Sequence, residues 1–116
     1  MSKRTALPIG SVVRVKDGTE PFMIINQCPV TEKDGAQGYF DFGAVTLPLG
    51  LVNQNIIFFN KEDIDEVLFI GYIDRRFQEF LSRYDEEVGK ISYDRFTVEE
   101  FKNRVGIPRV FSWDFL

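Results

Sequence analysis

The alternation of apolar and polar residues predicts strands over the first two-thirds of the chain. Residues 11–16 alternate, Asp17-Gly18 is a dipeptide that tolerates positive φ, and residues 22–25 form a second apolar run. This order is typical of a β-hairpin. A second turn dipeptide, Asp34-Gly35, leads into residues 39–45, where Phe40, Phe42 and Ala44 share one face. That segment is predicted to be a half-buried strand.

Two later apolar runs predict buried strands. Residues 56–59 read Ile-Ile-Phe-Phe and residues 67–70 read Val-Leu-Phe-Ile, so neither alternates. Uniformly apolar runs are typical of strands that are covered on both faces, and we expect residues 56–59 to be a central strand. Between the runs, Asn60 precedes three charged residues, which favours a single helical turn.

From Asp74 onward the spacing of apolar residues becomes helical. Five of them share one face of a predicted helix: Phe77, Phe80, Leu81, Tyr84 and Val88. This spacing predicts a long amphipathic helix, which Asp74 caps and Gly89 terminates in the left-handed conformation. A second, shorter helix is predicted from Thr97, and residues 107–116 follow it as an aromatic tail.

The order of these elements predicts an α+β architecture. Residues 8–72 are expected to form a small, curved antiparallel sheet or partial barrel of about five strands. The helical region, residues 74–106, would close the open side of that sheet with its long helix. A chain of 116 residues is in the usual size range of one domain, so residues 1–116 are expected to form a single domain.

Composition narrows the classes of partner and the compartment. The chain has 14 basic and 18 acidic residues and a net charge of -4, which disfavours nucleic acid because phosphate binding needs clustered lysine and arginine. No apolar stretch approaches the length of a membrane span or a signal peptide, so we expect no membrane partner. The single cysteine, Cys28, gives no sign of an oxidising compartment, and a cytoplasmic location is expected.

Residues that carry catalysis are scarce. The chain has no histidine, the commonest general base and a principal metal ligand. Cys28 has no base or cation among its sequence neighbours to activate it, and the acids in residues 62–66 and 85–87 are explained as solvated helical faces. The glycines lack phosphate-loop spacing. We therefore expect no catalytic, metal-binding or cofactor-binding residues, and we expect that the protein is not an enzyme.

A protein partner is the expected alternative, and two segments are candidates to contact it. The aromatic tail alternates Phe111, Trp113 and Phe115, a pattern that could add to a sheet edge or form a hot spot. The other interpretation, which we favour, is that the tail folds back and completes the core of its own domain. Tyr39, on the face opposite Phe40, is a second candidate contact. The sequence leaves self-association open.

Four stretches, in order, resemble the domain of unknown function 4176 family of Gram-positive bacteria. The resemblance covers about two-thirds of the chain. The stretches are Leu-Pro-Ile-Gly-Ser-Val-Val at 7–13, Met-Ile-Ile at 23–25, Tyr-Phe-Asp-Phe-Gly at 39–43 with Pro-Leu-Gly at 48–50, and Phe-Asn-Lys-Glu-Asp-Ile at 59–64 running into Val-Leu-Phe-Ile-Gly-Tyr at 67–72.

The resemblance implies a function that the residue chemistry does not. Members of that family are small cytoplasmic proteins encoded beside toxins that carry an LXG domain and leave the cell through the type VII secretion system. The resemblance therefore implies a chaperone or targeting adaptor that binds such a toxin before export. Two alternatives remain: an immunity protein that neutralises the catalytic domain of a cognate toxin, and an enzyme of unknown type.

Overall fold

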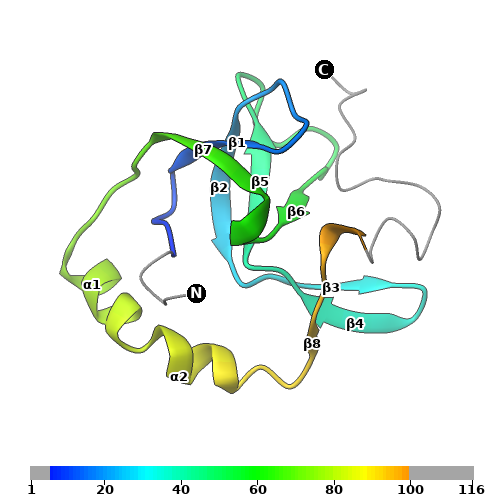
Figure 1. Ribbon diagram of the computed structural model, residues 1–116, viewed down its shortest axis with the longest axis vertical. Coiled ribbons are helices and arrows are strands. Elements are labelled where there is room, and N and C mark those ends of the chain that lie inside the picture. The colour runs from blue at the N-terminus through cyan, green and yellow to red at the C-terminus, as the bar shows by residue number, and fades with distance from the viewer. Residues whose placement is uncertain (1–5, 100–116) are drawn as a thin grey trace.

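The computed structural model describes residues 6–99, which form two small sheets flanked by two short helices (Figure 1). The larger sheet has five strands, and every neighbouring pair in it is antiparallel. In spatial order these strands are β6 (Ile57–Phe59), β5 (Phe42–Thr46), β2 (Phe22–Gln27), β1 (Val12–Val15) and β7 (Ile64–Phe69). The ends of this sheet are therefore β6 and β7.

The smaller sheet joins a hairpin to a segment from much later in the chain. Its strands are β3 (Val30–Lys33), β4 (Ala36–Tyr39) and β8 (Asp94–Arg95), with β4 and β8 parallel. Figure 1 shows β8 beside β4 after the chain has passed through both helices. This pairing brings residues 94–98 back to the strands.

Both turn dipeptides occupy the turns that the sequence predicts. Asp17 has a φ of 64° in the connection between β1 and β2, and Asp34 and Gly35 have φ values of 54° and 80° between β3 and β4. Two consecutive positive φ angles suit a two-residue hairpin because that backbone follows the twist of the strands. The predicted β1–β2 hairpin is confirmed.

The core is built mainly from phenylalanine rings contributed by both sheets. Its members are Val13, Val15, Phe22, Ile24, Phe40, Phe42, Ala44, Ile57, Phe59, Phe96 and Val98. Phe40 lies between the two sheets and contacts both Phe58, at a ring-centroid distance of 5.7 Å, and Phe96, at 5.8 Å. The prediction of a half-buried strand over residues 39–45 is wrong, because the chain crosses between sheets at Phe40 and Asp41, and residues 40–46 are all buried.

The α+β prediction with a long amphipathic helix is also wrong. The described residues are mostly β, and the helical segment is divided into α1 (Arg75–Ser82) and α2 (Tyr84–Gly89), with no closed barrel among residues 6–99. Arg83 lies between the helices with φ −111° and ψ 9°. Three acids follow Tyr84, and negative charge favours a helix N-terminus, so these acids support a new helix start.

The helices do not close the sheet either. Only Tyr84 is buried in α1 and α2, and Figure 1 shows both helices at the periphery. Phe96 and Val98 occupy the core instead. Gly89 is the last residue of α2 and has no positive φ, so its predicted role is wrong. Apart from its first residues, the helix predicted from Thr97 lies outside the described residues. No helix within residues 6–99 has the length and apolar character needed to cross a bilayer.

The two apolar runs that predicted covered strands both form sheet edges. The strand β6, expected to be central, has a neighbour only on the β5 side. The strand β7 is more unusual, because every residue from Asp65 to Phe69 is exposed. The sequence could not distinguish these cases, since a short apolar run has no period that reports which faces are covered.

Candidate functional site

Two bulges interrupt β7 where it pairs with β1. The register joins Val15 to Ile64, Arg14 to Glu66, Val13 to Val67, and Val12 to Phe69. Asp65 and Leu68 are therefore extra residues with no counterpart in β1. A bulge bends its strand, increases the local twist and redirects side chains. Because no other element within residues 6–99 covers β7, its consecutive apolar residues are exposed instead of alternating between core and solvent.

An apolar surface extends along β7 and into the segment that leads to α1. We call it the β7 ridge and define it as Ile9, Val67, Leu68, Phe69, Ile70, Tyr72 and Ile73. Each member is at least 40% exposed, and the exposed fraction reaches 61% at Phe69 and 77% at Tyr72. Singly exposed apolar residues are ordinary, but a contiguous group is typical of an interaction site.

Ile9 joins the ridge because the backbone approaches itself closely at Gly71. A Cβ atom at Gly71 would lie 2.3 Å from the carbonyl oxygen of Ile9 and 2.8 Å from the nitrogen of Ser11. Only glycine allows this approach. The Gly71 N–H also donates to the Ser11 Oγ at 2.9 Å. These contacts hold the N-terminal turn against the end of β7.

A cleft of about 460 Å³ adjoins the ridge between the N-terminal turn and α1. Its apolar lining comes from Pro8, Ile9, Tyr72, Phe77 and Phe80. The position of α1 follows from its cap, since the Asp74 carboxylate accepts a hydrogen bond from the Phe77 N–H at 2.9 Å. That bond also lowers the pKa of Asp74. The ridge and cleft together offer apolar side chains and a recess.

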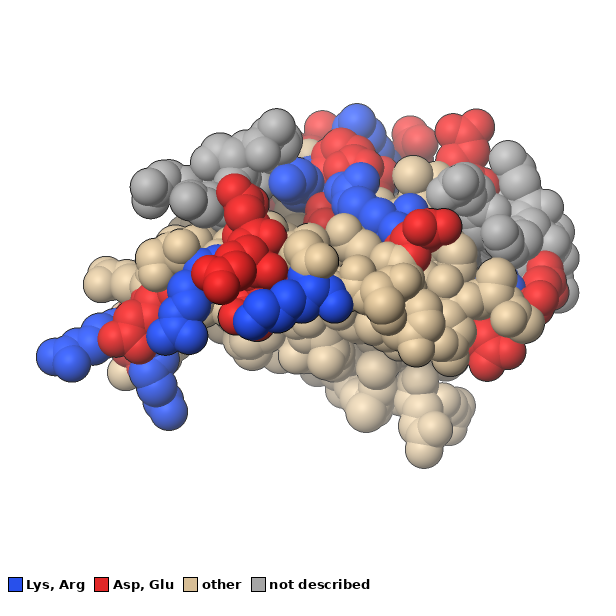
Figure 2. All heavy atoms as spheres, turned by 90° about the horizontal axis from the view of Figure 1, so that it is seen from below, with Lys and Arg blue, Asp and Glu red and all other residues tan. Residues whose placement is uncertain are grey.

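Charges of opposite sign flank the ridge. Asp65 and Glu66 precede it, and Arg75 and Arg76 follow it. Glu66 forms an ion pair with Arg14, whereas Asp65 and Arg75 have no ion pair within residues 6–99. Figure 2 shows the face that carries α1 and α2, where basic and acidic side chains intermingle beside uncharged surface.

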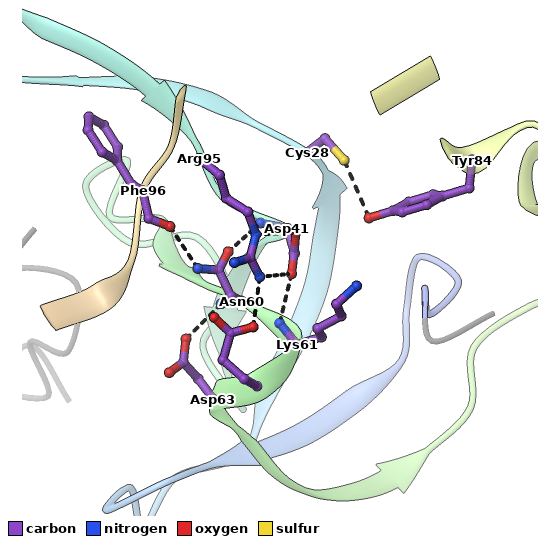
Figure 3. A network of polar contacts seen from close by, with 9 residues as sticks. Cys28, Asp41, Asn60, Lys61, Asp63, Tyr84, Arg95 and Phe96 are labelled. Carbon is purple, nitrogen blue, oxygen red and sulfur yellow. Dashed lines mark hydrogen bonds and ion pairs between the residues drawn. The ribbon is translucent and has the colours of Figure 1, made fainter. Parts of the chain in front are cut away.

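A second cluster of polar residues lies around buried Asn60 (Figure 3). The Asn60 side-chain amide donates to the carbonyl oxygen of Phe96 at 2.7 Å, and its oxygen accepts from the Asp41 N–H at 2.8 Å. Arg95 donates to both carboxylate oxygens of Asp41, at 3.2 and 2.7 Å, and to Glu62 at 2.7 Å. These bonds connect three parts of the chain: the crossover, the residues before β7, and β8.

The electrostatics of this cluster point to a structural role. The hydrogen bond to Asp41 raises the pKa of Arg95 above its ordinary value. Burial alone would raise the pKa of Glu62, but the hydrogen bond from Arg95, a backbone hydrogen bond and the positive charge of Arg95 together outweigh burial, and the net pKa is lowered. Burial raises the pKa of Asp63, whose carboxylate accepts the Asn60 N–H at 2.8 Å. The acids are thus paired with groups that hold the segment 94–96 in place.

Cys28 and Tyr84 make the remaining contact of chemical interest. The Cys28 Sγ lies 3.8 Å from the Tyr84 hydroxyl, and burial raises the pKa of both groups. A thiol with a raised pKa is a poor nucleophile at neutral pH because little thiolate is present. Within residues 6–99, no group of three or more His, Cys, Asp or Glu side chains could hold a metal ion.

Of the sequence-predicted contact residues, only Tyr39 is among the described residues, and it is not part of the ridge. Tyr39 is half-buried in β4, and its carbonyl oxygen accepts a hydrogen bond from the Phe96 N–H at 2.7 Å, so it borders the docked segment 94–96. Phe111, Trp113 and Phe115 lie outside the described residues. The ridge was missed because residues 67–70 predict a buried strand. The only available signal was Tyr72-Ile73, which continues the apolar run up to the cap of α1.

Comparison with known proteins identifies one family. The family model described as "Domain of unknown function (DUF4176)" matches residues 6–80, which confirms the resemblance expected from the sequence. No curated protein and no solved structure matches the chain. The matched region contains the whole β7 ridge and most of α1.

Proposed function

We propose that this chain, which belongs to the domain of unknown function 4176 family, is a non-enzymatic binding protein that acts as a chaperone or targeting adaptor. Its client docks on the β7 ridge. The observation that carries the proposal is the exposure of seven large apolar residues, six of them close together in the chain between Val67 and Ile73, and the seventh, Ile9, brought beside them at Gly71. Such a surface destabilises a free protein in solution by favouring aggregation, so its presence is best explained by a partner that covers it.

The ridge has the composition of a binding hot spot. Interface energy is concentrated in a few aromatic and aliphatic anchors that fill well-packed pockets. Phe69 and Tyr72 are the most exposed aromatic members of the ridge, and the cleft beside Tyr72 can receive an anchor from the partner. Full burial of a large apolar side chain contributes about 1.5–3 kcal/mol. Both rings are already partly covered, so burying their exposed parts favours binding by about 2–4 kcal/mol in total.

The client that we propose is a toxin with an LXG domain, bound in the cytoplasm before export by the type VII secretion system. The support for this client is the family membership together with a surface suited to a protein. The acidic charge of the chain, -4, would speed encounter with a basic or mixed-charge client and help to reject others. The adaptor would bind a domain remote from the active site of the toxin.

Co-expression with the toxin encoded next to this chain tests the proposal. We expect a stable stoichiometric complex with the toxin's export domain, and loss of that complex in the double variant Phe69→Ser, Tyr72→Ser. The matched control is Leu49→Ser, Leu51→Ser, which removes two residues of comparable exposure, 60% and 56%, from another loop. Unfolding curves should show that both double variants remain folded, since exposed substitutions change stability little.

Each other outcome has a clear meaning. If no complex forms, or if the ridge variant binds as well as the control variant, the proposal is wrong. If the complex forms only with the catalytic domain of the toxin, and the chain protects cells from that domain alone, the protein is an immunity protein.

A further inference from the structure

We propose that the β7 ridge receives an amphipathic α-helix of the partner, lying in one orientation. The N-terminal end of that helix carries acidic residues beside Arg75 and Arg76, and its C-terminal end carries basic residues beside Asp65. This inference rests on the proposed function and specifies how the client is recognised.

The geometry of β7 disfavours the main alternative, in which an extended peptide adds to the sheet edge. Strand addition requires a regular row of outward N–H and C=O groups. The extra residues Asp65 and Leu68 interrupt that row twice within a six-residue strand. Bulges of this kind are a common way of preventing edge pairing. Recognition at the ridge therefore relies on side chains, as it does when a helix lies in a groove.

The dimensions of the ridge fit a short helix. Seven residues from Val67 to Ile73 span roughly 20 Å at about 3.3 Å per extended residue. A helix of about 14 residues has the same length at 1.5 Å per residue. Its apolar residues at i, i+3, i+4 and i+7 would follow the ridge, and the largest of them would enter the cleft beside Tyr72.

The charges at the two ends set the orientation. Asp65 lies at the start of the ridge and Arg75 follows its end, and neither has an ion pair among the described residues. The Arg76 side chain is 90% exposed. A helix has a partial positive charge at its N-terminus and a partial negative charge at its C-terminus, so it tolerates acids in its first turn and bases in its last turn. A helix with that charge order matches the ridge in only one direction.

A second copy of this chain suits the ridge less well. Two copies would each carry a net charge of -4, which opposes their association. A copy would also present its own ridge, which is formed by an extended backbone. Self-association is therefore an outcome that the test must detect.

Two synthetic helical peptides of about 14 residues provide the test, with the full chain as the receptor. Both peptides carry the same leucine and phenylalanine stripe and a hydrocarbon staple on the polar face, so that helicity is equal. One has glutamates in its first turn and lysines in its last turn, and the other has these charges exchanged. Affinity is measured by titration calorimetry at low salt, and the mass of the free chain is measured over a range of concentrations.

We expect the first peptide to bind about tenfold more tightly than the second, because exchanging the charges turns the attraction at both ends of the helix into repulsion. The receptor variant Asp65→Lys, Arg75→Glu should reverse the preference, and both Arg75→Glu at a helix start and the exposed Asp65→Lys should leave the fold intact. Equal affinities, no binding of either peptide, no reversal in the variant, or a dimer of the free chain that buries the ridge would overturn the inference. The proposed function fails separately, through the toxin complex and its ridge variant, so the two failures are distinguishable.

Discussion

Replacing Asn60 by alanine removes the side chain that joins two distant backbone groups. The Asn60 side chain is fully buried, and it satisfies the N–H of Asp41 and the carbonyl oxygen of Phe96. In the Asn60→Ala variant both groups remain buried without these partners, and a small cavity replaces the amide. The docked segment 94–96 loses the bond to its Phe96 carbonyl oxygen, but it keeps the ion pairs of Arg95 with Asp41 and Glu62 and its backbone pairing with β4.

The expected cost follows from counting those two groups. Leaving a buried donor or acceptor unsatisfied costs about 1–3 kcal/mol, so the loss of both partners should lower the free energy of unfolding by about 2–6 kcal/mol. The total stability of a protein of this size is about 5–15 kcal/mol. The variant should therefore fold but unfold at a much lower denaturant concentration.

Urea unfolding followed by far-ultraviolet circular dichroism measures this effect. Asn26→Ala is the matched control because Asn26 is exposed on β2, and it should change stability by less than about 0.5 kcal/mol. A loss of under about 1 kcal/mol in Asn60→Ala, or an equal loss in the control, would refute the assignment of Asn60 as the link between these segments.

Three further predictions concern acid sensitivity, backbone packing and thiol reactivity. The pKa of Glu62 is lowered from its ordinary value of 4.5, so its ion pair stabilises the protein above that pH, and this contribution disappears as the pH falls through the folded pKa. The stability difference between the wild type and Glu62→Gln should therefore be present at neutral pH and vanish in acid. Urea unfolding from pH 3 to 7 measures this difference. Gly71→Ala should destabilise the protein by more than about 2 kcal/mol, because the new Cβ would meet the backbone of Ile9. A Cβ at Gly89 meets nothing within 4 Å, so Gly89→Ala should leave stability unchanged or raise it by up to about 1 kcal/mol. Equal thermal unfolding of the two variants would contradict this contrast. Because burial raises the pKa of Cys28, iodoacetamide should alkylate it much more slowly in the native protein than in urea at the same pH, and equal rates by mass spectrometry would show that the thiol is already accessible and ionised.

Local signals in the sequence predicted the turns and the N-cap of α1 well, although not the role of Gly89. Asp17, Asp34 and Asp74 act through backbone angles or hydrogen bonds within a few residues, and each occupies the predicted place. The single helical turn after Asn60 is also present, as the 3₁₀ helix η2 (Lys61–Asp63). Interactions of this range depend on neighbouring residues, so one sequence contains the necessary information.

Long-range arrangement was where prediction failed. The apolar spacing from Phe77 to Val88 is helical, yet it does not report that the chain breaks at Arg83 or that Phe96 takes the expected place of the helix in the core. Residues 67–70 predict a covered strand, but covering requires another element, and none lies over β7 among residues 6–99. Exposure of the ridge is a tertiary property, which no period or propensity encodes.

Because the segment 94–98 docks on the strands, the folded unit extends beyond the residues that match the family. The match ends at residue 80, whereas Phe96 and Val98 complete the ring cluster around Phe40. A fragment trimmed to the match would leave Phe40 open to water on one side and deprive Asn60 of its acceptor. Recombinant fragments, and any fusion intended to display the β7 ridge, must therefore extend through residue 99 to retain a closed interior.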